Sequence, residues 1–132
     1  MNFFDTNILV YAVSTDETKR EIAQKTLLLG GCVSVQVLNE FANVLRAKQK
    51  RAWSEIEATL DAIERWFETI KPLTLATHRS AVALARDHSI SLYDALIVAA
   101  AIEADCRRLY SEDLQDGRRF ASCVIVNPFL AR

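Results

Sequence analysis

Two kinds of hydrophobic pattern alternate along this chain, and they predict two kinds of secondary structure. Short apolar runs bounded by polar residues predict buried β-strands at 2–4, 32–35, 72–75, 109–110 and 124–126. Longer segments, in which apolar residues recur every three or four positions, predict helices at 8–13, 19–29, 37–50, 54–70, 77–88 and 91–104. Parallel strands need long crossovers, which helices supply, so this order predicts an α/β domain with a mainly parallel sheet.

The predicted helices differ in how they begin and end and in the faces that they can bury. Ser54 is expected to cap the helix 54–70, and Gly30-Gly31 to end the helix 19–29. The helix 91–104 is apolar on all sides, so we expect it to be buried or to face another subunit. The acids of helix 54–70 lie opposite its apolar face, which is typical of solvated surface and not of a binding site: Glu57, Asp61, Glu64 and Glu68.

Composition narrows the class of protein. At 132 residues the chain has the size of one domain, and we expect a single domain over 1–132. Hydrophobic residues make up 51% and charged residues 25%, which excludes a disordered chain. The start carries no basic leader and the apolar run 8–13 is too short to cross a bilayer, so a cytoplasmic location without a membrane partner is expected. Cys32, Cys106 and Cys123 form no CxxC pair and are expected to be buried free thiols.

Four acids stand where apolar segments meet loops or helix starts. Asp5 follows the first strand and Asp113 follows the strand 109–110, so both would lie at the carboxyl ends of parallel strands, where ligands bind in such sheets. Asp94 lies in the first turn of its helix, where the positive end of the helix dipole tolerates a carboxylate. Glu40 lies on the inward face of its helix with no cation in the preceding turn, and a charge in that place needs a partner.

Local structure offers an alternative for three of these acids. Asp5 could form a turn or cap a helix, Asp94 could complete a capping box with Ser91, and Asp113 could cap the turn at Leu114. Independent caps, however, have no reason to converge at one end of a sheet. Converging carboxylates repel one another, and a hard divalent cation is the usual remedy.

The expected ligand set indicates which cation and which reaction. No His or Cys cluster accompanies the acids, and His78 and His88 are expected at the surface, so Mg²⁺ or Mn²⁺ is favoured over Zn²⁺. Such a site suits phosphodiester hydrolysis by a metal-bound water. No P-loop, dinucleotide-binding glycine motif, or Ser or Cys nucleophile pattern competes with this interpretation.

The sequences around the acids resemble those of the PIN-domain nucleases, and most closely their VapC-type toxin branch. The resemblance rests on Asp5-Thr6-Asn7, Asn39-Glu40-Phe41, Leu92-Tyr93-Asp94-Ala95-Leu96-Ile97, Tyr110-Ser111-Glu112-Asp113-Leu114 and Val126-Asn127-Pro128-Phe129. It implies a three-layer α/β/α sandwich with a five-stranded, mainly parallel sheet. It also implies that the catalytic, metal-holding residues are Asp5, Glu40, Asp94 and Asp113.

The same resemblance implies supporting residues. Thr6, Asn7 and Ser111 stand where the family has groups that support the acids, and Asp116 is a weaker candidate for a water-mediated metal contact. One departure is Ala104-Asp105-Cys106, where relatives commonly place a glycine after the buried helix. This departure affects the end of the helix and not the site.

By the same resemblance, the protein would cut RNA with Mg²⁺ or Mn²⁺, form a homodimer, and be silenced by a small VapB-like antitoxin. A net charge of −1 is unusual for a protein that binds RNA, but four cations are concentrated within residues 46–51. The candidate contacts to the RNA backbone are Arg46, Lys48, Lys50 and Arg51, with Arg118-Arg119 as a second candidate. The alternative for the first group is a solvated helix end whose cations complement the helix dipole.

Two other functions compete with the toxin. A PIN nuclease of RNA processing would act without an antitoxin, and a short upstream gene for a small DNA-binding protein would favour the toxin instead. A phospho-acceptor signalling module would need clustered acids after the first strand, whereas Asp5 stands alone there.

Overall fold

The computed structural model describes residues 1–131, and Arg132, the last residue of the predicted domain, lies outside them. The strands are β1 (Asn2–Phe4), β2 (Val33–Ser34), β3 (Ile70–Lys71), β4 (Arg108–Tyr110), β5 (Arg119–Phe120) and β6 (Cys123–Val126). The helices are α1 (Thr6–Ala12), α2 (Glu17–Leu27), α3 (Val35–Asn43), the π-helix η1 (Val44–Lys48), α4 (Trp53–Trp66), α5 (Leu75–His88) and α6 (Leu92–Glu103).

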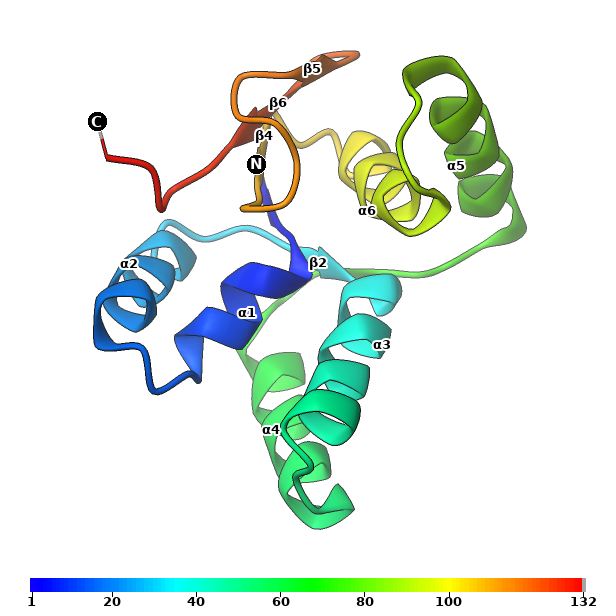
Figure 1. Cartoon of the computed structure of the whole chain (residues 1–132). Helices are drawn as coiled ribbons and strands as arrows, with labels where there is room; N and C mark the ends of the chain where they lie inside the picture. Colours follow the sequence, from blue (N-terminus) through cyan, green and yellow to red (C-terminus); the bar gives the residue numbers. More distant parts are fainter. Residues whose placement is uncertain (132) are drawn as a thin grey trace.

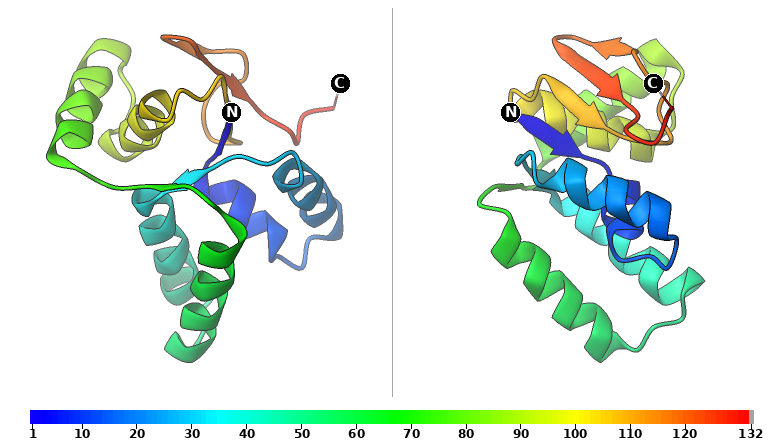
Figure 2. Two further views of the ribbon diagram at one scale, coloured as in Figure 1. Left: turned by 180° about the vertical axis from the view of Figure 1, so that it is seen from behind. Right: turned by 90° about the vertical axis from the view of Figure 1, so that its left-hand side faces the viewer.

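The strands form a central sheet in which the parallel arrangement prevails. Four strands pair in the order β1-β4-β6-β5, and β2 pairs with β3. A parallel bridge between Phe3 and Cys32 joins the two parts, with the Phe4 amide donating to the Cys32 carbonyl at 3.1 Å. Strand β5 runs antiparallel to β6, and the other pairs of described strands are parallel. Figure 2 shows β1, β4 and β6 side by side and pointing the same way. The predicted α/β/α fold with a mainly parallel sheet is confirmed, and β5 is an additional strand.

Helices cover the sheet on both sides. Helices α1 and α2 lie on one side and α5 and α6 on the other, while α3 and α4 project together from the end at β2 (Figure 1). The core is built from the strands and the inner helix faces, with Phe3, Phe4, Ile8, Phe41 and Ile97 almost completely buried. Helix α6 is buried from residue 95 to residue 101, as its all-apolar sequence predicts. Among the described residues, no helix has the length and apolarity needed to span a bilayer.

Two local predictions are wrong. The strand expected at 72–75 lies earlier, at Ile70–Lys71, and α5 begins at Leu75 because the Thr74 hydroxyl accepts the Thr77 amide at 3.1 Å. Pro72 has no amide hydrogen to donate to a neighbouring strand, which is consistent with pairing that stops before it. Ser54 does not cap α4: Ala52 takes the capping position without a side-chain hydrogen bond.

The three cysteines agree with the prediction. Cys32, Cys106 and Cys123 are buried and free.

The end of α6 is closed without the glycine that relatives commonly have there. Asp105 takes the left-handed backbone conformation, with φ of 54°, that a glycine would adopt more easily at this position. The Cys106 amide donates to the Ala101 carbonyl there at 3.0 Å, so the helix is closed without the glycine.

Candidate active site

Asp5 lies where β1 ends and α1 begins. Its amide donates to the Tyr110 carbonyl at 2.9 Å, which continues the pairing of β1 with β4. Its Oδ1 accepts the Thr6 amide at 2.7 Å, so Asp5 does cap α1. Its Oδ2 accepts the Ser111 hydroxyl at 2.7 Å, and only 4% of the residue is exposed. A helix cap at the surface needs no such burial, so capping alone does not explain why the Asp5 carboxylate is buried.

Ser111 links Asp5 to the loop that carries Asp113. The Ser111 Oγ, which is wholly buried, accepts the amides of Asp113 at 3.2 Å and Leu114 at 3.3 Å while it donates to Asp5. Asn7 spans the same gap: its Oδ1 accepts the Glu112 amide at 3.1 Å, and its Nδ2 lies 3.5 Å from Asp5 Oδ2. The structure therefore places Asn7 and Ser111 between the first and last of the predicted acids.

Glu40 and Asp94 approach from two other helices. Glu40 is half-buried on α3, and its Oε2 accepts the Gln36 amide group at 3.2 Å. Asp94 is half-buried in the first turn of α6, where its backbone amide donates to the Ser91 hydroxyl at 3.1 Å. One half of the expected capping box, the bond from the Asp94 amide to Ser91, is thus present, and the charge of Asp94 lies close enough to Asp5 and Glu40 to raise their pKa values.

The carboxylates are close enough to shift one another's pKa. Burial, opposed by hydrogen bonds from Ser111 and Thr6, raises the pKa of Asp5 to about 6, and the charges of Asp113 and Asp94 add to the rise. Burial and then the charge of Asp5 raise the pKa of Glu40 to about 7, with Asp94 and Asp113 contributing. Burial also raises the pKa of Asp94, and Asp113 adds to it. Four acids from four parts of the chain therefore share one electrostatic environment.

A cavity of about 430 Å³ opens beside these acids. Its wall includes Asp5, Glu40 and Asp113, the helix positions Tyr11 and Lys48, and also Thr6, Asn7, Val10, Val44, Gln49 and Glu112. Asp94 is not part of that wall. Acidic groups thus line one part of the cavity and a cation from η1 lines another, which suits a substrate with both a charged backbone and a metal-bound phosphate.

The donor set fits a hard divalent cation, although the acids are not drawn tightly together. All four side chains offer carboxylate oxygens, which Mg²⁺ and Mn²⁺ prefer. The Thr6 Oγ1 is buried and has no hydrogen-bond partner among the described residues, so it can bond a water or another ligand there. Within residues 1–131, no three His, Cys, Asp or Glu side chains form a compact cluster ready to hold a metal. Because Mg²⁺ usually keeps several waters, contacts through water suit this looser arrangement.

The four cations predicted to contact RNA have different surroundings. Lys48 lines the cavity. The Arg46 guanidinium donates to the Arg51 carbonyl at 3.0 Å and lies 5.0 Å from the centre of the Trp53 ring, so it braces the turn after η1. Lys50 and Arg51 do not line the cavity, and Lys50 has a left-handed backbone, with φ of 53°.

The weaker candidates are engaged elsewhere. The Asp116 Oδ1 accepts the Asn127 amide at 2.7 Å, which ties the carboxylate to the segment after β6. The Arg118 guanidinium donates to the His88 carbonyl at 2.7 Å and lies 4.8 Å from the centre of the Phe120 ring. His88 packs edge-on against Phe120 and is half-buried, contrary to its expected surface position, whereas His78 is exposed.

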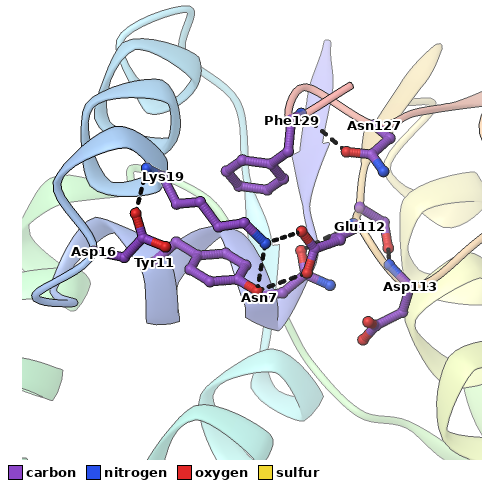
Figure 3. A network of polar contacts seen from close by, with 9 residues as sticks. Asn7, Tyr11, Asp16, Lys19, Glu112, Asp113, Asn127 and Phe129 are labelled. Carbon is purple, nitrogen blue, oxygen red and sulfur yellow. Dashed lines mark hydrogen bonds and ion pairs between the residues drawn. The ribbon is translucent and has the colours of Figure 1, made fainter. Parts of the chain in front are cut away.

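A polar cluster beside the acids was not predicted. The Tyr11 hydroxyl donates to Glu112 Oε1 at 2.7 Å, and the Lys19 ammonium donates to Glu112 Oε2 at 2.6 Å and to the Tyr11 hydroxyl at 3.0 Å (Figure 3). Hydrogen bonds with Glu112 and then Tyr11 raise the pKa of Lys19, which therefore stays charged. The position of Glu112 beside Asp113 was the one available signal, because nothing in the sequence pairs Lys19 with a residue 93 positions away.

Comparisons with known proteins agree with this fold. One chain of a toxin-antitoxin complex from Klebsiella pneumoniae is 21% identical, with 98% of each chain covered and a TM-score of 0.74. VapC20 of Mycobacterium tuberculosis, a sarcin-ricin loop cleaving toxin, is 17% identical over 86% of this chain and 90% of its own, with a TM-score of 0.68. A chain of VapBC2 from Rickettsia felis, solved with a promoter DNA fragment, is 18% identical over 94% and 96%, also at 0.68.

At these sequence identities the likeness to the solved structures establishes a shared fold. A comparison with curated proteins found no match. The family model of the PIN domain matches residues 3–120, which include all four acids and the strands from β2 to β5. The chain therefore belongs to the PIN domain family.

Proposed function

We propose that this chain is a Mg²⁺-dependent endoribonuclease and the toxin component of a VapBC-type toxin-antitoxin pair. The observation that carries the proposal is the convergence of four carboxylates at the carboxyl ends of the parallel strands, with three of their pKa values raised in part by the neighbouring charges. Membership of the PIN domain family, which includes nucleases, supports hydrolysis as the reaction.

The four acids Asp5, Glu40, Asp94 and Asp113 would hold the cation, with Mn²⁺ as an alternative to Mg²⁺. The bound cation would supply a water of lowered pKa and would offset charge on the phosphate. Ser111 fixes the orientation of the Asp5 carboxylate through the bond at 2.7 Å. Burial of Asp5 keeps bulk water from competing for its oxygens, which strengthens its attraction for a cation. Asp116 is the weaker candidate because its carboxylate already binds the Asn127 amide.

The proposed substrate and partner draw support from the similar structures. One is a sarcin-ricin loop cleaving toxin, which supports RNA as the substrate class. Others were solved as a toxin-antitoxin complex and as VapBC2 with promoter DNA, which supports a small VapB-like antitoxin. A homodimer acting in the cytoplasm completes the proposal.

The direct test is cleavage of a labelled single-stranded RNA by the purified protein, with and without metal. We expect cleavage in millimolar Mg²⁺ or Mn²⁺, loss of cleavage in EDTA, and recovery when metal is restored in excess. Induced expression should arrest growth, and coexpression of a small protein encoded next to the gene should relieve the arrest. Cleavage that persists in EDTA would contradict a metal site, and arrest that no neighbouring protein relieves would favour an RNA-processing nuclease.

Alanine variants of Lys48 and Arg46 should distinguish a residue that binds RNA from one that supports the structure. Replacing Lys48 by Ala is expected to raise KM for RNA about 3- to 10-fold. The slope of log KM against the logarithm of the salt concentration should fall by about the amount that one phosphate contact contributes. Replacing Arg46 by Ala should lower the melting temperature by a few degrees, because the bond to Arg51 and the contact with Trp53 are lost. Steady-state kinetics at several salt concentrations check the first result; an equal KM change in both variants would contradict the assignment.

A further inference from the structure

Asp113 has an unusual combination of properties among the four acids. Its charge contributes to the raised pKa of each of the other three, so it lies within reach of all of them. It is nevertheless exposed, and its carboxylate makes no hydrogen bond within residues 1–131. The position of this carboxylate therefore depends on how the loop backbone is held.

Two neighbouring residues hold that backbone. Ser111 accepts the Asp113 amide and donates to Asp5, which fixes one side of the loop. Glu112 fixes the other side: its amide donates to Asn7, and its carboxylate accepts bonds from α1 and α2. In Figure 3 the Glu112 carboxylate points toward the Lys19 ammonium, whereas the Asp113 carboxylate lies apart from that ammonium.

The contacts of Glu112 form a network and not a single surface ion pair. Lys19 and Tyr11 each bond one oxygen of the Glu112 carboxylate and also bond each other. The Lys19 ammonium lies 4.4 Å from the centre of the Tyr11 ring and 5.5 Å from that of Phe129, and the two rings meet edge-on at 4.9 Å. Isolated ion pairs at the surface define geometry poorly, but a network of this kind restricts each member.

An ion pair on α5 offers a comparison within the same chain. The side chains of Arg86 and Asp87 are 72% and 56% exposed, whereas those of Lys19 and Glu112 are 33% and 26% exposed. The Lys19 pair is therefore better shielded from water. It also joins segments that are 93 residues apart, whereas Arg86 and Asp87 are adjacent. Only the first pair can fix one part of the fold against another.

We propose that Glu112 is a positioning residue for Asp113. Lys19 and Tyr11 hold the Glu112 carboxylate, and the loop so fixed keeps Asp113 facing the other acids. This inference rests on the proposed function in one respect: it takes the four acids to be the metal site. A displacement of about 1 Å in such a group can cost about 100-fold in rate, so anchoring an otherwise unbonded carboxylate has a large effect.

Variants Glu112→Ala and Lys19→Met test the inference by three measurements. Calorimetric titration should show Mn²⁺ binding weakened about 3- to 10-fold, since partners of metal ligands typically contribute 10- to 100-fold and this one acts through the backbone. Amide hydrogen exchange of Asp113 should accelerate about tenfold in metal-free protein, because the loop opens more readily. RNA cleavage should show kcat lowered about tenfold with KM within twofold of wild type.

Conservative and distant variants control for general loss of structure. Lys19→Arg keeps the positive charge and should restore Mn²⁺ affinity and exchange to near wild-type values. Arg86→Met removes the exposed pair on α5 and should leave all three measurements unchanged. Tyr11→Phe, which keeps the ring but loses the hydroxyl, should give an intermediate effect.

The outcomes separate this inference from the proposed function. Wild-type Mn²⁺ affinity and wild-type exchange of the Asp113 amide in both Glu112→Ala and Lys19→Met would overturn the positioning role, whatever the activity. If wild-type protein neither binds Mn²⁺ nor cleaves RNA, the proposed function fails, and the exchange measurement alone still decides whether Glu112 fixes the loop. Faster exchange with unchanged Mn²⁺ affinity would also overturn the inference, because the loop would then not position a metal ligand.

Discussion

Asp5→Asn is expected to lower RNA cleavage more than about 100-fold while the protein still folds. Partners of metal ligands already contribute about 10- to 100-fold in metal affinity or activity, so loss of a ligand's charge should cost more. Asn keeps the size of the side chain and one oxygen for the Thr6 amide, so the cap of α1 persists. The rate constant for cleavage, measured beside the circular dichroism spectrum, separates loss of chemistry from loss of structure.

Asp16→Asn is the matched control, because Asp16 caps α2 as Asp5 caps α1. Its Oδ1 accepts the Lys19 amide at 3.1 Å, and the residue is exposed. Asn is as good a capping residue as Asp, so cleavage should stay within about twofold of wild type. If Asp5→Asn were as active as Asp16→Asn, Asp5 would be only a cap, and the proposed metal site would lose its most buried member.

Gly31→Ala is expected to destabilise the protein by about 3 kcal/mol or more, which lowers the melting temperature by on the order of 10 °C. A Cβ at this position would lie 2.3 Å from the Asn2 carbonyl oxygen and 2.9 Å from the Phe4 ring. The oxygen belongs to the backbone that accepts the Cys32 amide at 2.9 Å, so it cannot move without weakening the bridge between β1 and β2. Thermal unfolding followed by circular dichroism measures the effect.

Gly30→Ala provides the comparison at the adjacent position. Gly30 has φ of 79°, which costs an alanine about 1 kcal/mol, but an added Cβ would meet nothing within 4 Å. We therefore expect a decrease in melting temperature about one third as large as that of Gly31→Ala. Equal decreases in the two variants would show that backbone conformation, and not the contact with Asn2, determines the loss.

The sequence predicted the elements whose hydrophobic period is unambiguous. Helix α6 could be placed because its apolar run is long, and β1 because a buried run precedes Asp5 directly. The strand β3 was misplaced because its two residues are too few to show a period, and Pro72-Leu73 beside them is more apolar than Ile70-Lys71. β5 escaped prediction for the same reason.

The candidate site was predictable to the extent that its residues mark the ends of elements. Asp5 and Asp113 come shortly after strands and Asp94 lies in the first turn of α6, and the topology of a parallel sheet brings such ends together, whereas Glu40 lies inside α3. The cluster of Lys19, Tyr11 and Glu112 depends on how α2 packs against the loop after β4, which no local pattern reports. The different surroundings of Lys48, which lines the cavity, and Arg46, which contacts Trp53, likewise depend on the turn after η1. The catalytic and metal-binding roles themselves stay predictions.

The two outer strands of the sheet are each only two residues long, and each carries a cation, Lys71 in β3 and Arg119 in β5. Unpaired strand edges are the usual starting points for fibrils and other disordered aggregates, and shortness and positive charge both discourage such growth. Both borders of the sheet therefore discourage the addition of a strand from a second molecule, so growth of a fibril from these edges is disfavoured.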